Sequence, residues 1–121
     1  MEAEKHKFKI YNDTLILTLE HTEDNSIDDY LWNIRKSLPD DYISYKTIGL
    51  DFIYTEYVNS NMIGAYIAVF KEIKRLKKEF IFLNVSNELK TIFTLIHIDE
   101  HIKMYDFNQS EKIYNTLREN R

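Results

Sequence analysis

The pattern of apolar and polar positions changes its period in the middle of the chain. Residues 48–53 read I-G-L-D-F-I, an apolar and partly β-branched run that predicts a buried strand at the centre of a sheet. After a short polar turn around Thr55 and Glu56, apolar residues recur every three or four positions, as on the broad buried face of a helix. The apolar positions of this second segment are Met62, Ile63, Tyr66, Ile67, Val69, Phe70, Ile73 and Leu76. The centre of the chain therefore predicts a strand that leads into a core helix.

Asn59 and Ser60 stand where this helix is predicted to begin, and Tyr57 and Val58 are expected to lead the chain inward just before it. Either of the first two residues can be the N-cap, because a short side-chain oxygen accepts from the unpaired N–H groups of the first turn. Five basic residues gather at the far end, where positive charge complements the helix dipole. They are Lys71, Lys74, Arg75, Lys77 and Lys78. Their simplest interpretation is a solvated helix end, with a phosphate-binding or lipid-surface role as the minor alternative.

The first part of the chain predicts a hairpin and a helix. Residues 8–11 and 14–20 are two strands joined by an Asn-Asp turn. The apolar row of the following helix consists of Ile27, Leu31, Ile34 and Leu38, and the candidate caps before it are Asp24, Asn25 and Ser26. Pro39 ends this helix. Tyr30 and Trp32 flank the apolar row and are expected to pack partly against the sheet.

The second half of the chain continues the alternation of strands and helices. Strands are predicted at residues 80–85 and 102–105, with a helix capped at Ser86 between them and a terminal helix at residues 108–120. The apolar side of the middle helix carries Leu89, Ile92, Phe93 and Ile96, and the residues predicted to dock the terminal helix are Ile113, Tyr114 and Leu117. The order β-β-α-β-α-β-α-β-α predicts an α/β fold with a mixed sheet of four or five strands and helices packed against it.

Composition narrows the class of protein. A chain of 121 residues with 44% hydrophobic content fits a single domain over residues 1–121, with a core at about 8–106. A net charge of −4 argues against a broad nucleic-acid surface. Because no apolar run approaches the ~18 residues of a membrane span and the first residues are charged, we expect no membrane insertion and a cytoplasmic location. The absence of cysteine excludes disulfides and thiol nucleophiles.

One stretch matches a catalytic motif literally. Residues 97–101 read H-I-D-E-H, the H-x-x-E-H pattern of certain zinc proteases, which needs both histidines on one face of a helix. We expect this match to be accidental, because a helix should end and a strand begin there. His6 and His21 have no partner at ligand spacing and are expected on the surface. With only two glycines, the chain also has no glycine-rich phosphate loop. No catalytic residue, metal site or cofactor is therefore predicted.

The centre of the chain resembles a known family. Residues 49–65, G-L-D-F-I-Y-T-E-Y-V-N-S-N-M-I-G-A, and residues 89–105, L-K-T-I-F-T-L-I-H-I-D-E-H-I-K-M-Y, resemble the STAS domain of bacterial anti-sigma factor antagonists. In that family an aspartate ends a central strand, and a D-[ST]-[ST]-G-L-G-A motif opens the helix after the next loop. Asp51 falls on that aspartate, Ser60 falls on the hydroxyl that a partner kinase phosphorylates, and residues 63–65 match L-G-A.

The resemblance implies a regulatory protein-binding module and not an enzyme. Such a module binds an anti-sigma factor that is also a serine kinase, and it releases that partner when Ser60 is phosphorylated. The implied partner-binding residues are Asp24, Tyr57, Asn59, Ser60, Asn61 and Met62. Asn59, Asn61 and Met62 replace the family's usual aspartate, small residue and glycine, which favours the alternative of a non-phosphorylated STAS scaffold in a signalling assembly or a transport complex. Whether the module is a monomer or a homodimer stays open.

Overall fold

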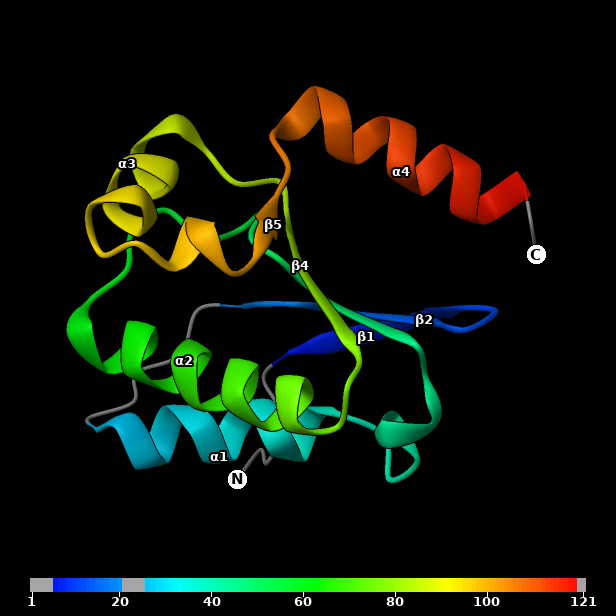
Figure 1. Cartoon of the computed structure of the whole chain (residues 1–121), viewed down its shortest axis with the longest axis horizontal. Coiled ribbons are helices and arrows are strands. Elements are labelled where there is room, and N and C mark those ends of the chain that lie inside the picture. Colours follow the sequence, from blue (N-terminus) through cyan, green and yellow to red (C-terminus); the bar gives the residue numbers. More distant parts are fainter. Residues whose placement is uncertain (1–5, 21–25, 120–121) are drawn as a thin grey trace.

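The strands of the described part of the chain form one mixed sheet. The structure is a computed structural model that describes residues 6–20 and 26–119. The strands are β1 (Lys7–Tyr11), β2 (Thr14–Thr18), β3 (Thr47–Asp51), β4 (Glu79–Leu83) and β5 (Lys103–Met104). β1 and β2 form an antiparallel hairpin, and β2 to β5 pair in parallel in that order. β3 therefore lies at the centre of the sheet, as its apolar sequence predicts (Figure 1).

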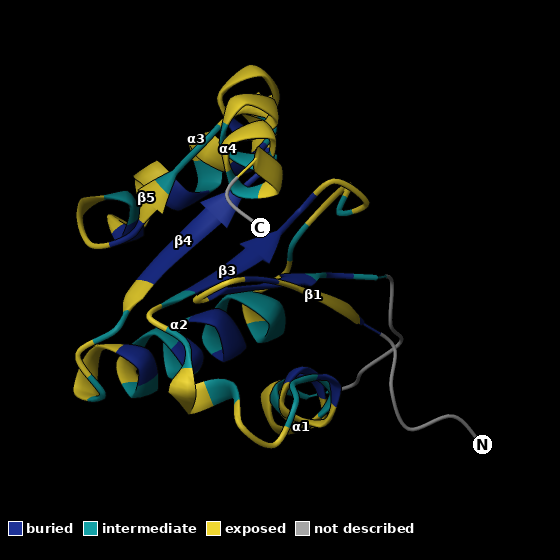
Figure 2. Ribbon diagram, turned by 90° about the vertical axis from the view of Figure 1, so that its right-hand side faces the viewer, coloured by how far each residue is buried: buried dark blue, intermediate teal, exposed yellow. Residues whose placement is uncertain are grey.

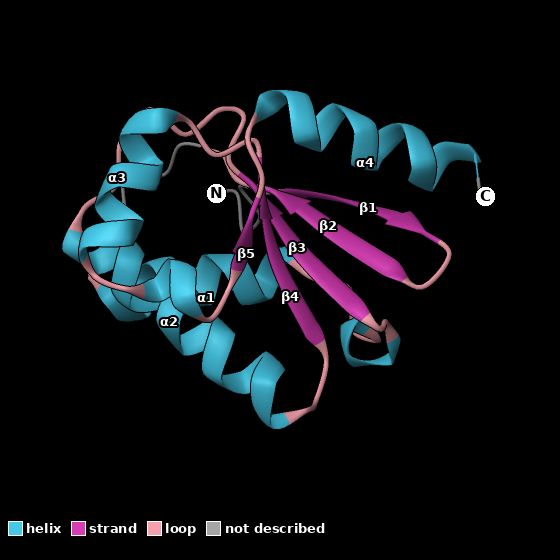
Figure 3. Cartoon of the chain, turned by 45° about the horizontal axis from the view of Figure 1, so that its top comes forward, coloured by secondary structure: helices cyan, strands magenta, loops and turns pink. Residues whose placement is uncertain are grey.

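Helices cover both faces of this sheet. α1 (Ile27–Ser37) and α2 (Ser60–Arg75) lie side by side on one face, and α4 (Phe107–Glu119) lies on the other (Figure 1, Figure 3). α3 (Asn87–Leu95) follows β4 and packs into the same core as α1 and α2. Short 3₁₀ turns occur at Tyr42–Ser44 and Ile98–Glu100. The predicted order of strands and helices is confirmed.

Two apolar clusters of unequal size hold these layers together. In the larger one, between the sheet and the helices α1 to α3, neighbouring aromatic rings have centroids 4.8 to 6.4 Å apart. These rings belong to Phe52, Tyr66, Phe80, Phe82 and Phe93. The smaller cluster lies under α4 and contains Tyr11, Ile16, Ile81 and Leu83, against which Tyr105, Ile113, Tyr114 and Leu117 pack. Figure 2 shows β3 and β4 as buried strands between the two layers. The predicted docking of the terminal helix is confirmed.

Side-chain caps and one glycine fix where the helices lie. The caps are Ser26, which accepts from Asp29 N at 3.0 Å, Asn59, which accepts from Met62 N at 2.9 Å, and Ser86, which accepts from Leu89 N at 3.2 Å. Gly64 lets α1 and α2 approach closely, since a Cβ at that position would lie 2.8 Å from Ile27 Cδ1. Because Gly64 is in the second turn of α2 and Ile27 begins α1, the two helices start at the same edge of the sheet.

Trp32 lies on the side of α1 that faces away from the sheet, which corrects its predicted packing. It is 54% exposed, and the Lys36 ammonium lies 5.2 Å from its ring centroid. The buried side of α1 is formed by Tyr30, Ile34 and Ser37. Tyr30 therefore packs inward as predicted, whereas Trp32, two residues later, is turned about 200° around the helix axis.

His6 and Ile53 are also placed differently from the predictions. His6 is buried, with 2% exposure, and its Nδ1 accepts a hydrogen bond from Glu20 N at 2.9 Å. Ile53 is 46% exposed because β3 ends at Asp51 and the next residues turn, so the strand prediction extends two residues too far. The predictions for Asp24, Asn25 and His21 fall outside the described residues.

Candidate functional site

The candidate site lies where β3 ends and α2 begins. Asn59 has extended backbone angles (φ −119°, ψ 178°), and its side chain caps the helix through Met62 N. Its carbonyl oxygen also accepts from Ile63 N at 3.0 Å. Ser60 is consequently the first residue inside the helix and is exposed. Of the two predicted candidates for the cap, Asn59 is confirmed, and Ser60 is not the cap because it already lies inside the helix.

The loop before the helix has a buried base and an exposed outer side. Phe52 is 1% exposed, and its N–H donates to Leu83 O at 2.9 Å, which extends the pairing of β3 and β4 by one bond. Thr55 N then donates to Phe52 O at 2.9 Å and turns the chain outward. Tyr54, within this turn, and Tyr57, after it, are 64% and 57% exposed. Tyr57 does not lead inward as predicted, because the chain has already turned away from the core.

Asp51 anchors the base of this loop. Its side chain is buried with 3% exposure, and Oδ1 accepts from Ile53 N at 2.9 Å. Asn84 Nδ2 donates to the two carboxylate oxygens at 3.0 and 3.2 Å, and the Tyr114 hydroxyl donates to Oδ2. Burial and this hydrogen bond to Asp51 raise the pKa of the Tyr114 hydroxyl well above its ordinary value. One carboxylate therefore joins the end of β3, the segment after β4 and the terminal helix.

Asn84 is held in place from the other side as well. Its backbone is in the left-handed region (φ 53°), which asparagine tolerates better than most residues. Asn84 N donates to Ser110 Oγ at 2.7 Å, and Ser110 is fully buried. The hydroxyl of Ser110 donates in turn to Tyr105 O at 3.3 Å. Asp51 and Ser110 are buried and Asn84 and Tyr114 are half-buried, and the hydrogen bonds that join them give the loop a rigid base.

The first turn of α2 differs in charge from those of its neighbours. It contains no acidic residue, whereas α1 carries Asp28 and Asp29 and α3 carries Glu88 in the first turn. An acidic side chain near a helix N-terminus compensates the positive end of the helix dipole. At Ser60 that compensation is missing within the turn, so the site can accommodate an added negative charge.

The structure brings together most of the predicted partner-binding residues. Asn59, Ser60 and Tyr57 are exposed, and Asn61 and Met62 are half-buried beside them. Met62 packs against the main core, so its side chain is shared between the surface and the interior. Asp24 lies outside the described residues. The sequence interpretation missed Ile53 and Tyr54 as surface residues; the polar Thr55 and Glu56 that follow them mark the turn that exposes them.

The H-x-x-E-H stretch does not form a helical pair of histidines. α3 ends at Leu95, and His97 has a left-handed backbone (φ 65°), so a helix ends there as predicted. His97 Nδ1 lies 2.9 Å from Glu100 Oε2 in an exposed pair. Residues 6–20 and 26–119 contain no group of three metal-ligating side chains that could hold an ion.

Comparison with known proteins finds proteins similar to this chain by structure and not by sequence. The sequence matches no family model and no curated protein. Its structure matches that of TM1081 from Thermotoga maritima, described as a candidate anti-sigma factor antagonist, with a TM-score of 0.67 and 20% identity over 93% of this chain and 94% of that one. The fold is that of the anti-sigma factor antagonists. The predicted STAS fold is therefore confirmed.

Two further solved structures share this STAS fold. One is the phosphorylated form of SpoIIAA, a cell fate determinant of Bacillus, with a TM-score of 0.60 and 16% identity over 92% of this chain and 98% of that one. The other is a chain of the stressosome, a signal integration and transduction hub, with a TM-score of 0.68 and 14% identity over 93% of this chain and 96% of that one. At such identities the likeness concerns the fold. Within the described residues, no helix has the length and apolar character needed to cross a membrane.

Proposed function

We propose that this chain is a non-enzymatic regulatory module of the anti-sigma factor antagonist type, which binds an anti-sigma factor with serine kinase activity in the bacterial cytoplasm. The observation that carries the proposal is the exposed Ser60 at the start of α2, in a turn without acidic side chains and next to an exposed apolar loop. The unphosphorylated module binds its partner through this surface. Phosphorylation of Ser60 releases the partner.

The loop between β3 and α2 supplies the contact area. Ile53, Tyr54 and Tyr57 expose 46%, 64% and 57% of their surface within one short segment. Aromatic residues are enriched at the centres of protein interfaces, where their burial contributes much of the binding energy. The buried Asp51 holds the base of the loop in one conformation before a partner binds. Binding therefore costs less conformational entropy than it would with a disordered loop.

A phosphoryl group on Ser60 changes the charge of this surface without opposing the fold. It adds about −1.5 to −2 charges at neutral pH. The dipole of α2 favours a negative charge there by about 0.3–1 kcal/mol. A partner covering the same position would have to bury that charge without a counter-ion, which costs several kcal/mol. Phosphorylation therefore weakens binding far more than it changes stability.

The first test is phosphorylation itself. The purified protein is incubated with ATP and an anti-sigma factor of the serine kinase type from the same genome, and its intact mass is measured. We expect a gain of one phosphoryl group in the parent and in Ser44→Ala, which alters another exposed serine. Ser60→Ala should show no gain. A gain that persists in Ser60→Ala would place the modification elsewhere and refute the assignment.

The second test is binding of the unmodified and charged forms to the anti-sigma factor, measured by calorimetry. We expect Ser60→Glu to weaken the affinity at least about tenfold, because an uncompensated buried charge costs more than about 1.4 kcal/mol. Ser44→Glu adds the same charge away from the site and should bind within twofold of the parent. Equal binding by Ser60→Glu and the parent, with both folded, would exclude the switch.

The alternative is a scaffold of the same fold that works without phosphorylation, in a signalling assembly or a transport complex. The departures at Asn59, Asn61 and Met62 favour it, since they surround Ser60 with residues other than those of the family motif. The likeness to a stressosome chain fits such a role. Retained partner binding by Ser60→Glu, together with no mass gain in the parent, would be the result that supports the scaffold.

A further inference from the structure

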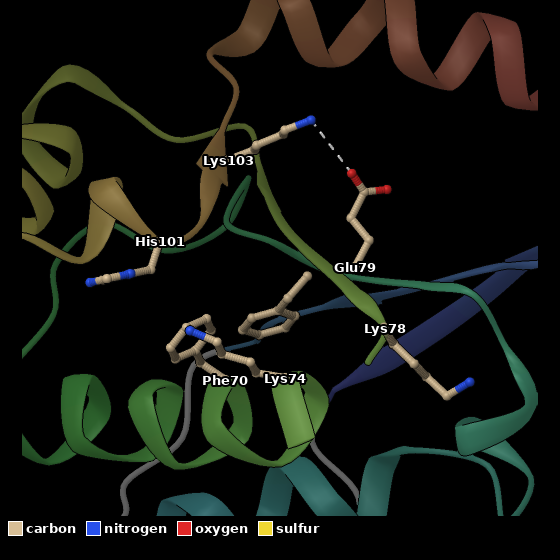
Figure 4. Close-up of a pocket in the computed structure, with 7 residues that line it drawn as sticks. Phe70, Lys74, Lys78, Glu79, His101 and Lys103 are labelled. Carbon is tan, nitrogen blue, oxygen red and sulfur yellow. Dashed lines mark ion pairs between the residues drawn. The ribbon is translucent and has the colours of Figure 1, made fainter. Parts of the chain in front are cut away.

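A pocket of about 230 Å³ lies at the opposite end of α2 from Ser60. It opens between the last turns of α2 and the edge of the sheet where β4 meets β5 (Figure 4). β5 pairs only with Ile81 and Phe82, although β4 begins at Glu79. Glu79 and Phe80 therefore extend beyond their neighbouring strand, and the missing strand length leaves the space that forms the pocket.

Aromatic rings form the inner wall. Phe80 is 6% exposed and belongs to the main core, so its ring is fixed by packing. Phe70, from α2, is half-buried and also packs against that core. The His101 ring, which enters from the segment before β5, has its centroid 6.0 Å from that of Phe70 at an interplanar angle of 39°. The pocket thus presents flat aromatic surface from three separate parts of the chain, of which the two phenylalanine rings are apolar.

Positive charge surrounds this apolar wall. Lys74 Nζ lies 5.7 Å from the centroid of the Phe70 ring, and Lys78 and Lys103 also line the pocket. Glu79 is the one carboxylate among the lining residues, and it faces Lys103 at 3.7 Å (Figure 4). Lys74 and Lys78 have no carboxylate partner among residues 6–20 and 26–119. The pocket is therefore cationic on a chain whose net charge is −4.

We propose that this pocket binds a small organic anion with a flat apolar body, of the class of aromatic carboxylates and aryl phosphates. The ring of the ligand lies against Phe70 and Phe80, and its anionic group is bound by the Lys74 ammonium. The volume is smaller than the roughly 300–1,000 Å³ of pockets for drug-sized ligands, which favours a molecule of one ring. The lysine cluster of α2, most simply interpreted as a solvated helix end, thereby gains a binding role.

Nuclear magnetic resonance titration of the ¹⁵N-labelled protein tests this proposal with four probes. Benzoate and phenyl phosphate carry both the ring and the charge, benzyl alcohol carries the ring alone, and inorganic phosphate carries the charge alone. We expect saturable shifts of the backbone amides of Phe70, Phe80 and Lys103 with at least one of the first two probes. Benzyl alcohol and inorganic phosphate should bind at least about fivefold more weakly.

Two charge reversals on α2 distinguish binding in the pocket from a general effect of charge on anion binding. Lys74→Glu should weaken the binding of the anionic probe at least fivefold, with Lys74→Gln between it and the parent. Lys71→Glu makes the same change on an exposed residue of the same helix outside the pocket and should stay within twofold. The proposal is overturned if neither aromatic anion binds saturably, if benzyl alcohol or phosphate binds as well, or if Lys71→Glu and Lys74→Glu have equal effects.

Discussion

Different interactions hold the helices against the two faces of the sheet. On the face covered by α1 and α2, buried aromatic and aliphatic side chains make one large cluster. On the face covered by α4, the apolar cluster is smaller, and a hydrogen-bond network around the buried Asp51, with the half-buried Asn84 and Tyr114, accompanies it. Apolar packing stabilises without regard to direction, whereas a buried carboxylate must meet its donors in one geometry. The first face therefore provides most of the stability, and the second fixes where the site loop begins.

The largest expected effect tests the apolar face. Phe82 is fully buried among four aromatic rings, so Phe82→Ala should lose about 3–5 kcal/mol of unfolding free energy through lost transfer energy and a cavity. Ile81, the preceding residue of β4, faces the α4 cluster. Ile81→Ala should lose less, about 2–3 kcal/mol. Urea unfolding measures both, and a larger loss for Ile81→Ala would reverse the comparison.

The second prediction concerns the polar network. Asp51→Ala would leave the Ile53 N–H, the Asn84 amide and the Tyr114 hydroxyl without their acceptor, at a cost of about 1–3 kcal/mol. Asp51→Asn keeps an oxygen for two of these donors and should lose less. Urea unfolding and the amide spectrum of the site loop would follow the change. If Asp51→Ala were as stable as the parent, the network would have no anchoring role.

The third prediction tests the close packing of α1 against α2 at Gly64. Even a Cβ atom on Gly64 would lie too close to the Ile27 side chain. The larger side chain of Gly64→Leu should therefore destabilise the protein by about 1–3 kcal/mol. Gly64→Ala should be nearly neutral, because displacement of the flexible end of Ile27 offsets the higher helix propensity of alanine. Thermal unfolding distinguishes the two variants. Equal melting temperatures for Gly64→Leu and the parent would contradict the close packing.

The fourth prediction is a difference in stability between Tyr42→Phe and the parent that appears only at alkaline pH. Burial and hydrogen bonding to Glu72 raise the pKa of Tyr42, beside α1 and α2, from 10.0 to about 12. The folded state therefore holds this proton more tightly than the unfolded state, so its contribution to stability is complete below pH 10 and is lost between about pH 10 and 12. Tyr42→Phe should lose less stability over that interval than the parent. Urea midpoints at pH 8 and 11 measure this, and equal losses would refute it.

The smallest expected effect is at the candidate site. Ser60 is exposed and does not cap α2, so Ser60→Ala should change the unfolding free energy by no more than about 0.5 kcal/mol, and Ser60→Glu should raise it by no more than about 1 kcal/mol. Asn59→Ala removes the actual cap and should lose about 0.5–2 kcal/mol. Thermal unfolding of the three variants measures whether Asn59→Ala loses the most stability. A large loss in Ser60→Ala would mean that this serine stabilises the helix after all.

The sequence by itself determined the order of strands and helices. The periods of two and of three to four residues, the cap at Ser86, the run of three candidate caps that includes Ser26, and the stop at Pro39 are local signals. Each depends on residues a few positions apart. The buried place of β3 could be predicted from its apolar and partly β-branched residues, and the continuous apolar run of β4 is typical of a strand that is covered on both faces. The position of Asn59 and Ser60 at the start of α2 is equally local, which is why the candidate site could be predicted.

Only the tertiary structure decided which side chains meet. Asp51 contacts Asn84 and Tyr114, which are 33 and 63 residues away in the sequence, and no local pattern encodes such pairs. His6 is buried because α1 and the end of β2 enclose it, although its neighbours in sequence are charged. Likewise, the cationic pocket exists because β5 is shorter than β4 and leaves Glu79 and Phe80 without a neighbouring strand on that side, which depends on how distant segments pair. Periodicity indicates which residues face inward, whereas the partners that they meet depend on how the distant segments pack.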